Sequence, residues 1–395
     1  MLLNPNIPRT RSINSLLAAL LLQSAGALAD CVTPPANAEW PTASAGERGF
    51  TAAELQVALN TFNERDTNLH ALLIERDGEL LLECYRSGKD TPITRRYGLP
   101  LPFTGSSEFD ADKLHDQRSI SKSVVSLLYG IALAEQQAPP LDRPVLKDYP
   151  SLTPTWQHSE PPLTYQHLLG MTAGLDWQEL GHGLFSSDET PLYWRRDLAT
   201  YVLDRDRVAS PGSRFTYNGG ATALIAATLE QRSQQTLAAL AADRLFTPLG
   251  ITRFEWAEDT RNRSLAFAGL RLRPRDLLKI GRLVNQRGQW QGQQLISTGW
   301  IDDTTAAQIT TDIDLFSLDG KPVHYGYQWW SGTVQVAGRE HRWIAAIGNG
   351  GQRLLLIPVL QLGMVLQGGD YGSAEIQRRE NQLVLQLLAA IGPQD

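Results

Sequence analysis

A serine and a lysine three residues apart, Ser119 and Lys122, form the pattern in this sequence with the clearest chemical potential. Residues at this spacing lie on one face of a helix. The mainly apolar residues 124–133 predict a buried helix that places Ser119 at its first turn. There the free N–H groups and the helix dipole favour negative charge near the serine oxygen. Because a buried lysine loses proton affinity, the pair can act as nucleophile and base.

Two further segments carry groups that suit the same chemistry. Tyr217 lies in the turn-rich segment 211–220, from which it can relay a proton to a leaving group if Lys122 lowers its pKa. The glycine-rich segment 348–352 can lie against a substrate, and one of its N–H groups can form an oxyanion hole with the N–H of Ser119. Each of the three patterns also has a simpler interpretation. Ser119 and Lys122 could be a helix cap and a solvated lysine, Tyr217 a core tyrosine, and segment 348–352 a hairpin turn.

Composition and charge exclude several classes of protein. The 395 residues suffice for two subdomains. The net charge of −6, without a basic stripe, argues against nucleic acid as a partner. The histidines show no paired metal-ligand spacing and there is no Cys-x-x-Cys, so we expect no metal site and no cofactor. The Gly-x-Ser-x-Gly elbow of α/β-hydrolases is also missing.

The first 29 residues are typical of a secretory signal peptide. Arg9 and Arg11 precede the apolar stretch 16–22, and Ala27-Leu28-Ala29 forms an A-x-A cleavage site. The alternative, an uncleaved anchor, is disfavoured because the apolar stretch is short for a bilayer. We therefore expect an exported protein, periplasmic or secreted, with no transmembrane segment after cleavage. In such a compartment Cys31 and Cys84 can pair, although the sequence leaves this open.

The periodicity predicts strands at both ends of the chain around a helical centre. We expect a hairpin over residues 68–86, short strands over 342–347, 354–357 and 362–367, and helices over 52–63, 164–169, 221–230, 235–245, 274–284 and 373–391. This order predicts a discontinuous α/β domain, 30–104 and 311–395, with a mostly helical domain, 105–310, inserted in it. The helical domain would carry Ser119, Lys122 and Tyr217. The alternative arrangement, two domains that follow each other along the chain, is less favourable because the first hairpin would then form a two-stranded sheet of marginal stability.

Several segments in one order resemble the serine β-lactamase and penicillin-binding-protein superfamily. The chain looks most similar to the class C β-lactamase-related esterases and amidases, including 6-aminohexanoate-dimer hydrolase-like proteins. The resemblance runs from about residue 68 to residue 371. It rests on the segments 115–123, 168–177, 211–218, 269–277, 325–330 and 348–352. It implies a mixed α/β (α+β) fold of the β-lactamase/transpeptidase type, with an antiparallel sheet flanked by helices and an inserted, mostly helical domain.

The resemblance also implies roles for individual residues. Ser119 would be the acylated nucleophile, Lys122 its base and Tyr217 the second proton-transfer residue. The family's Tyr-x-Asn or Tyr-x-Ser motif is replaced by Tyr217-Asn218-Gly219, so the amide that holds a substrate is missing or displaced to Asn218.

The Lys-Thr-Gly motif of penicillin binders also lacks a counterpart with a cation. Its place is taken by Ala346-Ile347-Gly348 or, if the alignment slips, by Asn349-Gly350-Gly351. We therefore expect substrate and oxyanion contacts around Asn218, Gly348, Asn349 and Gly350, without efficient β-lactam turnover.

Together these observations predict an exported serine hydrolase that cleaves a small carboxylic ester or amide through an acyl-enzyme at Ser119. Its partner would be a small-molecule substrate. One alternative is a β-lactamase or D-alanyl-D-alanine carboxypeptidase. Another is a binding or sensor module of the same fold that acylates once or never.

Overall fold

The computed structural model describes residues 30–32, 39–64, 67–96, 105–182 and 186–393. Its centre is a nine-stranded sheet in the order β1-β3-β2-β16-β15-β14-β13-β12-β11, and all neighbouring strands are antiparallel. The strands are β1 (Asp30–Val32), β2 (Leu69–Arg76), β3 (Glu79–Tyr85), β11 (Ile309–Thr310), β12 (His324–Tyr325), β13 (Trp330–Val336), β14 (Arg339–Gly348), β15 (Gln352–Ile357) and β16 (Leu362–Gly368). The expected antiparallel sheet is confirmed.

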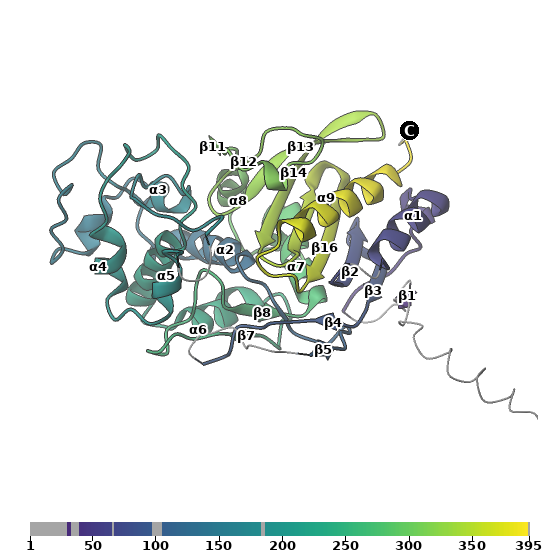
Figure 1. Ribbon diagram of the computed structural model, residues 1–395, viewed down its shortest axis with the longest axis horizontal. Coiled ribbons are helices and arrows are strands. Elements are labelled where there is room, and N and C mark those ends of the chain that lie inside the picture. Colours follow the sequence, from purple (N-terminus) through teal and green to yellow (C-terminus); the bar gives the residue numbers. More distant parts are fainter. Residues whose placement is uncertain (1–29, 33–38, 65–66, 97–104, 183–185, 394–395) are drawn as a thin grey trace, which may run out of the picture.

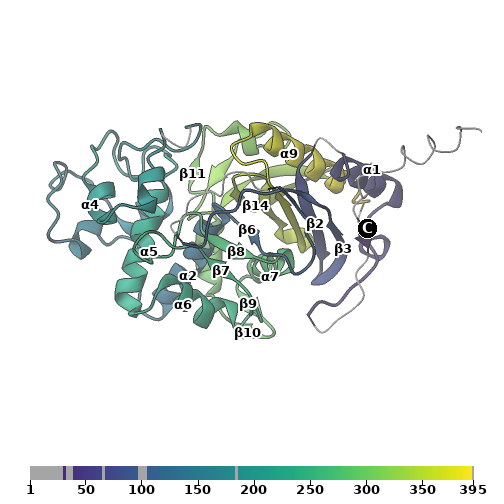
Figure 2. The same ribbon diagram turned by 60° about the horizontal axis from the view of Figure 1, so that its bottom comes forward.

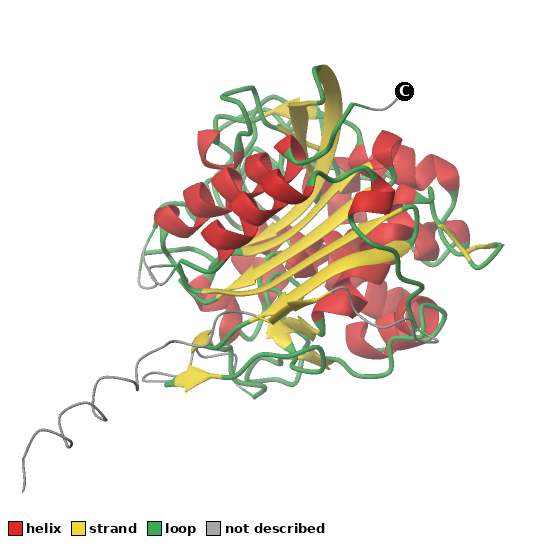
Figure 3. Cartoon of the chain, turned by 90° about the vertical axis from the view of Figure 1, so that its right-hand side faces the viewer, coloured by secondary structure: helices red, strands yellow, loops and turns green. Residues whose placement is uncertain are grey.

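Helices cover both faces of this sheet and form a separate group beside it (Figure 1, Figure 3). They are α1 (Ala52–Phe62), α2 (Ile120–Ala134), α3 (Tyr165–Leu169), α4 (Leu198–Leu203), α5 (Gly219–Ser233), α6 (Leu237–Ala241), α7 (Pro274–Asn285), α8 (Thr298–Thr305) and α9 (Ala374–Ala389). The strands β6 (His115–Asp116), β8 (Leu270–Leu272) and β7 (Glu255–Trp256) form a second, small sheet. Helix α2 runs between the helical group and the large sheet (Figure 1).

The first hairpin shows how the sequence sets a local structure. Its turn residues Asp77 and Gly78 both have positive φ, 55° and 80°, which the tight turns of antiparallel hairpins require. Strands β2 and β3 are almost fully buried, because helices cover one face of the sheet and other helices cover the opposite face. The expected hairpin over residues 68–86 is confirmed.

Strand β15 alternates between the two helical layers. Leu354 and Leu356 face α7, where a Cβ added at Gly281 would lie 2.7 and 2.9 Å from their side chains. Arg353, the residue before Leu354, points the other way and donates to Asn381 of α9 at 2.7 Å. Figure 2 shows α9 and α7 on opposite sides of the strands. Because successive side chains of a strand point to opposite faces, β15 contacts both helical layers, and the sheet lies between them.

Gln328 ties the helical group to the sheet. It lies in the turn between β12 and β13, with a φ of 69°. Its backbone carbonyl accepts from Ser123 of α2 at 2.6 Å, and its side-chain oxygen accepts from Thr222 of α5 at 2.8 Å. Its side-chain nitrogen donates to the carbonyl of Leu169 in α3 at 2.8 Å. One buried residue thus contacts three helices, including α2, which carries Lys122 and is capped by Ser119.

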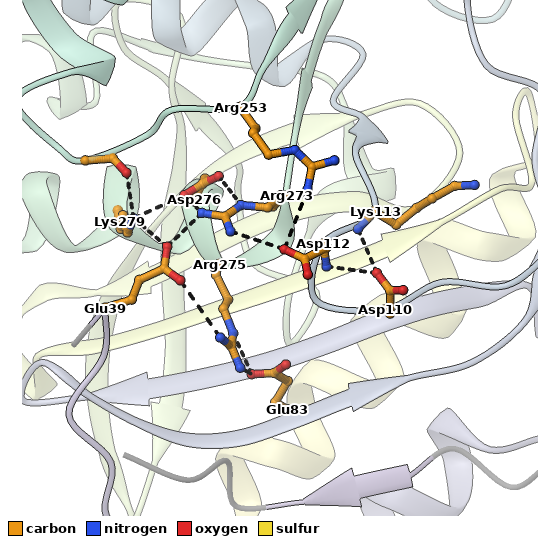
Figure 4. A network of polar contacts seen from close by, with 11 residues as sticks. Glu39, Glu83, Asp110, Asp112, Lys113, Arg253, Arg273, Arg275, Asp276 and Lys279 are labelled. Atoms are coloured by element: carbon orange, nitrogen blue, oxygen red, sulfur yellow. Dashed lines mark hydrogen bonds and ion pairs between the residues drawn. The ribbon is translucent and has the colours of Figure 1, made fainter. Parts of the chain in front are cut away.

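The chain before the first hairpin is fastened to the body of the protein. Cys31 forms a disulfide with Cys84, its register partner on β3. Glu39 lies beside α7, where Lys279 and Arg273 each donate to it at 2.7 Å (Figure 4). Together these contacts hold the start of the described chain against the sheet and its covering helix.

The predicted division into domains stays a prediction. Helix α7, which it assigned to the helical part, lies against β15 and β16 of the sheet. The predicted signal peptide, residues 1–29, lies outside the described residues. Within the described ranges, every helix is too short or too polar to cross a membrane.

Candidate active site

Ser119 occupies the N-terminal cap of α2, as the sequence predicts. Its φ is −66°, and its carbonyl accepts the first helical hydrogen bond from the N–H of Lys122 at 3.0 Å. The residue before it, Arg118, has a φ of 48°, in the left-handed region that few non-glycine residues adopt. The chain therefore turns sharply into the helix, and the Ser119 side chain is left partly exposed at a pocket.

Lys122 lies directly behind this serine. Its side chain is 1% exposed, and its Nζ donates to Ser119 Oγ at 3.1 Å and to the carbonyl of Phe267 at 3.0 Å. Nucleophile and base candidates are thus within hydrogen-bonding distance before any substrate is bound. This is the geometry that the spacing of the two residues predicts.

Two acidic residues that the sequence analysis missed also face Lys122. Glu179 Oε1 and Glu189 Oε2 each lie 3.5 Å from Lys122 Nζ. Glu179 follows α3 and accepts hydrogen bonds from the Trp177 indole at 2.8 Å and from the N–H of Gly219 at 2.6 Å. Burial, together with the negative charge of Glu179, holds the pKa of Glu189 well above its usual range. The environment of Lys122 is therefore acidic as well as buried.

Tyr217 approaches the same serine from the side of α5. It is 7% exposed, and Lys122 Nζ lies 4.7 Å from the centre of its ring. Burial and the negative charge of Glu179 raise the pKa of Tyr217 well above its usual value, although a hydrogen bond with Ser119 opposes this rise. This direction is opposite to the lowering by Lys122 that the sequence-based proton relay assumed as its condition. A neutral Tyr217 phenol can donate its proton to a leaving group.

Asn218 caps helix α5. Its side chain accepts from the N–H of Ala221 at 3.0 Å, and it is 2% exposed. It is not among the residues that line the pocket beside Ser119. An asparagine followed by two glycines and an alanine is a helix start signal, so this capping role is visible in the sequence.

The glycine-rich segment lies where the oxyanion expectation places it. Gly348 ends β14, and a Cβ there would lie 2.4 Å from the carbonyl of Gln117. Only glycine lets the strand approach the turn before Ser119 so closely. Gly348 and Asn349 line the pocket, and the Asn349 side chain accepts from the N–H of Gly372 at 2.7 Å. Gly350, with a φ of 92°, turns away against the ring of Tyr371 and is not part of the lining.

The pocket around Ser119 has a volume of about 740 Å³. Its walls combine acidic, basic and aromatic side chains, namely Glu179, Glu189, Arg118, Tyr193, Phe316 and Trp330. Leu180 and Trp194, exposed by 41% and 48%, lie at the same site. Trp330 stacks on Tyr217 at 5.8 Å between ring centres, whereas Trp177 and Trp329 are buried in the core.

Arg118 is the basic side chain of this wall, and the sequence analysis did not single it out. Its guanidinium lies 4.0 Å from the centre of the Tyr371 ring and donates to the carbonyl of Thr91 at 2.6 Å. Asp116 lies 3.6 Å away. These contacts fix a cation next to the nucleophile candidate.

Comparisons with known proteins agree with this architecture. The profile of the Beta-lactamase family matches residues 87–389. The 6-aminohexanoate-dimer hydrolase of Paenarthrobacter ureafaciens is 26% identical over 341 residues, 80% of this chain and 79% of that protein. Among solved structures, "EstCE1, a hydrolase with promiscuous acyltransferase activity" has a TM-score of 0.63 at 16% identity, covering 88% of this chain and 98% of that one. A β-lactamase/D-alanine carboxypeptidase from Pseudomonas syringae has a TM-score of 0.59 at 16% identity, covering 87% and 100%.

The antiparallel sheet between helical layers, with the helical group beside it, is the fold of the serine β-lactamase and penicillin-binding-protein superfamily. The protein is a hydrolase, of the serine type by family. The chain belongs to the Beta-lactamase family.

Proposed function

We propose that this protein is an exported serine hydrolase that cleaves a small carboxylic ester or amide through an acyl-enzyme at Ser119. The observation that carries the proposal is the 3.1 Å hydrogen bond from Lys122 Nζ to Ser119 Oγ at the N-terminal end of α2, in the wall of a 740 Å³ pocket. An exposed capping serine does not need a buried lysine behind it, so this contact favours chemistry over simple capping.

In the proposed acylation, Lys122 acts as a neutral amine: Ser119 Oγ attacks the substrate carbonyl, and the proton of Ser119 passes to Lys122 Nζ to form the ammonium. The N–H groups of Ser119 and of the Gly348 end of β14 would stabilise the oxyanion. The Tyr217 phenol donates its proton to the leaving group and regains one from the Lys122 ammonium, so the protons balance. Water then attacks the ester at Ser119 and releases the acid.

The choice of an ester or amide rests on the wall of the pocket and on the relatives. Aromatic side chains such as Phe316 and Trp330 suit the apolar part of a small acyl compound. One relative is named for an amide, the 6-aminohexanoate dimer. Export is supported by the predicted signal peptide and by the Cys31–Cys84 disulfide, since such bonds persist mainly in oxidising compartments.

One observation favours a second candidate, hydrolysis of a β-lactam or a D-alanyl-D-alanine peptide. These substrates carry a carboxylate, and the sequence pattern left the Gly348 region without a cation. Arg118 places a guanidinium in the same pocket from another position. An anionic substrate therefore has a partner of opposite charge, although that partner is held by Asp116 and Thr91.

The test is a substrate panel of p-nitrophenyl esters, anilides and a chromogenic cephalosporin, measured with the wild type and with Ser119→Ala. We expect ester or anilide turnover in the wild type, with kcat falling by about 10⁴-fold or more in the variant. Rapid cephalosporin hydrolysis with poor ester turnover would move the second candidate ahead. Full activity in a folded Ser119→Ala variant would overturn the assignment of the nucleophile.

A further inference from the structure

Two carboxyl groups from different parts of the chain converge on one lysine. Glu179 and Glu189 are ten residues apart, and both have an oxygen 3.5 Å from Lys122 Nζ. They also lie near one another. A Cβ added at Gly219 would be 3.2 Å from Glu179 Oε2 and 3.1 Å from Glu189 Oε2. The side chains are 7% and 21% exposed, so the cluster is mostly shielded from water.

The charges of this cluster do not balance if every group is ionised. One ammonium faces two carboxylates, whereas the buried cluster at α7 sets Lys279 and Arg273 against Glu39 and Asp276. A surplus carboxylate in a buried site is costly. Two carboxyls in contact relieve this cost by sharing a proton, as like charges at short distance cannot both ionise easily.

The surroundings of the two acids differ in a way that decides which one carries the proton. Glu179 Oε2 accepts from the Trp177 indole and from the N–H of Gly219, and such donors stabilise a carboxylate. Glu189 borders the pocket, and burial beside the charge of Glu179 holds its pKa well above the usual range. A proton on Glu189 can form a hydrogen bond to Glu179, and the pair then carries one negative charge opposite one lysine.

We propose that Glu179 and Glu189 share one proton and position Lys122 against Ser119, with Glu179 as the carboxylate and Glu189 as the carboxylic acid. The inference rests on the proposed function, because it concerns the base of the same reaction. Both glutamates act through Lys122 and are therefore positioning residues.

The pair makes acylation sensitive to alkaline pH. When Glu189 loses the shared proton, a second negative charge appears beside Lys122. That charge holds the proton on the lysine and opposes the negative charge that develops on the substrate oxygen next to Ser119. The groups that face Glu189 are Lys122 from α2, Glu179, and Tyr217 before α5. Tyr193, from the helical turn that follows Glu189 (Thr190–Tyr193), also faces it and is itself near Arg118. His182 lines the same pocket.

The experiment measures the second-order rate of fluorophosphonate acylation from about pH 5 to about pH 10. The variants are Glu189→Gln, which keeps a neutral side chain of the same shape, and Glu189→Ala, which removes the hydrogen bond. Asp176→Asn is the matched control, since it removes an exposed acid from the same loop three residues before Glu179. Carbon-13 NMR of carboxyl-labelled glutamate follows the proton directly in the wild type and in Glu189→Gln.

We expect the wild type and Asp176→Asn to lose acylation rate at alkaline pH. At neutral pH Glu189→Gln should acylate at least about tenfold faster than Glu189→Ala, and unlike the wild type it should lack the alkaline loss. One glutamate resonance with a raised pKa should disappear in Glu189→Gln.

Other results would overturn the inference. If Glu189→Gln still lost acylation rate at alkaline pH as the wild type does, no shared proton would be needed. The same would follow if its acylation rate at neutral pH were as low as that of Glu189→Ala. A wild type that never reacts would contradict the proposed function itself. In that case the NMR titration still decides separately whether the two glutamates share a proton.

Discussion

Two buried lysines of this protein have the same local spacing and opposite surroundings. Lys122 follows Ser119 by three residues on α2, and Lys279 follows Asp276 by three residues on α7. Lys279 Nζ contacts Glu39 at 2.7 Å and Asp276 at 3.2 Å, in a network that also includes Arg273 (Figure 4). Lys122 instead has the neutral oxygens of Ser119 and Phe267 at 3.0–3.1 Å and two carboxyls at 3.5 Å.

The difference separates a structural ion pair from a reactive group. Lys279 is held in close charged contacts that balance within the cluster, and it joins the start of the described chain to the covering helix. Lys122 makes its shortest contacts with the Ser119 hydroxyl, which can exchange a proton, and with the Phe267 carbonyl, which can only accept a hydrogen bond. It also lies behind a pocket. We therefore expect the first lysine to contribute mainly to stability and the second mainly to reaction rate.

Replacing the lysine at the pocket should give the largest effect. Lys122→Met removes the proposed base while keeping the volume of the side chain. We expect kcat/KM to fall by about 10³-fold or more, equivalent to about 4 kcal/mol of barrier. The urea unfolding midpoint should change less than that of Lys279→Met, because Lys122 lies 3.5 Å from its two carboxyls whereas Lys279 makes charged contacts at 2.7 and 3.2 Å. Ester hydrolysis and urea unfolding, measured on one preparation, check both statements.

The matched replacement on α7 should reverse this pattern. Lys279→Met leaves Asp276, which is fully buried, and Glu39 with one cation fewer. Breaking a buried ion pair from one side destabilises by about 3–5 kcal/mol. We expect a clear fall in the urea midpoint and an unchanged kcat per folded molecule. If Lys279→Met instead lost activity as completely as Lys122→Met, the two lysines would not differ in role.

The smallest effect concerns acid stability. Burial raises the pKa of Glu39, but the hydrogen bond from Lys279 and the charges of Lys279 and Arg273 outweigh it and lower the pKa below the usual value. A carboxyl with a lowered folded-state pKa contributes stability above its unfolded pKa, and this stability is lost as pH falls through the folded value. The wild type should therefore lose stability below about pH 4.5. Lys279→Met should lose less stability than the wild type over the same pH range. Urea unfolding at a series of pH values and matched ionic strength measures this, and the same dependence of stability on pH in both proteins would contradict the linkage.

Much of this account could be predicted from the sequence, where local rules and tertiary packing agree. The hairpin turn at Asp77-Gly78, the proline start of α7 and the cap of α3 at Thr164 follow from local chemistry. The Ser119–Lys122 contact follows from helical spacing alone.

The parts that escaped prediction depend on contacts between distant segments. Glu179 and Glu189 lie in irregular chain, without a period that assigns them a face, and only folding brings them to α2. Arg118 lines the pocket with its backbone in a left-handed conformation, which nothing in its side-chain type indicates. The raised pKa of Tyr217 likewise depends on burial in the folded protein and then on the charge of Glu179, a residue 38 positions earlier in the chain.

The central claim is that Ser119 is a nucleophile activated by its surroundings on α2. Intact-mass analysis after brief exposure to a fluorophosphonate tests it most directly, with the wild type, Ser119→Ala and Lys279→Met compared side by side. The account predicts one adduct on the wild type and on Lys279→Met, located at Ser119 by peptide mapping, and none on Ser119→Ala. An adduct of equal extent on Ser119→Ala, or no adduct on the folded wild type, would contradict it.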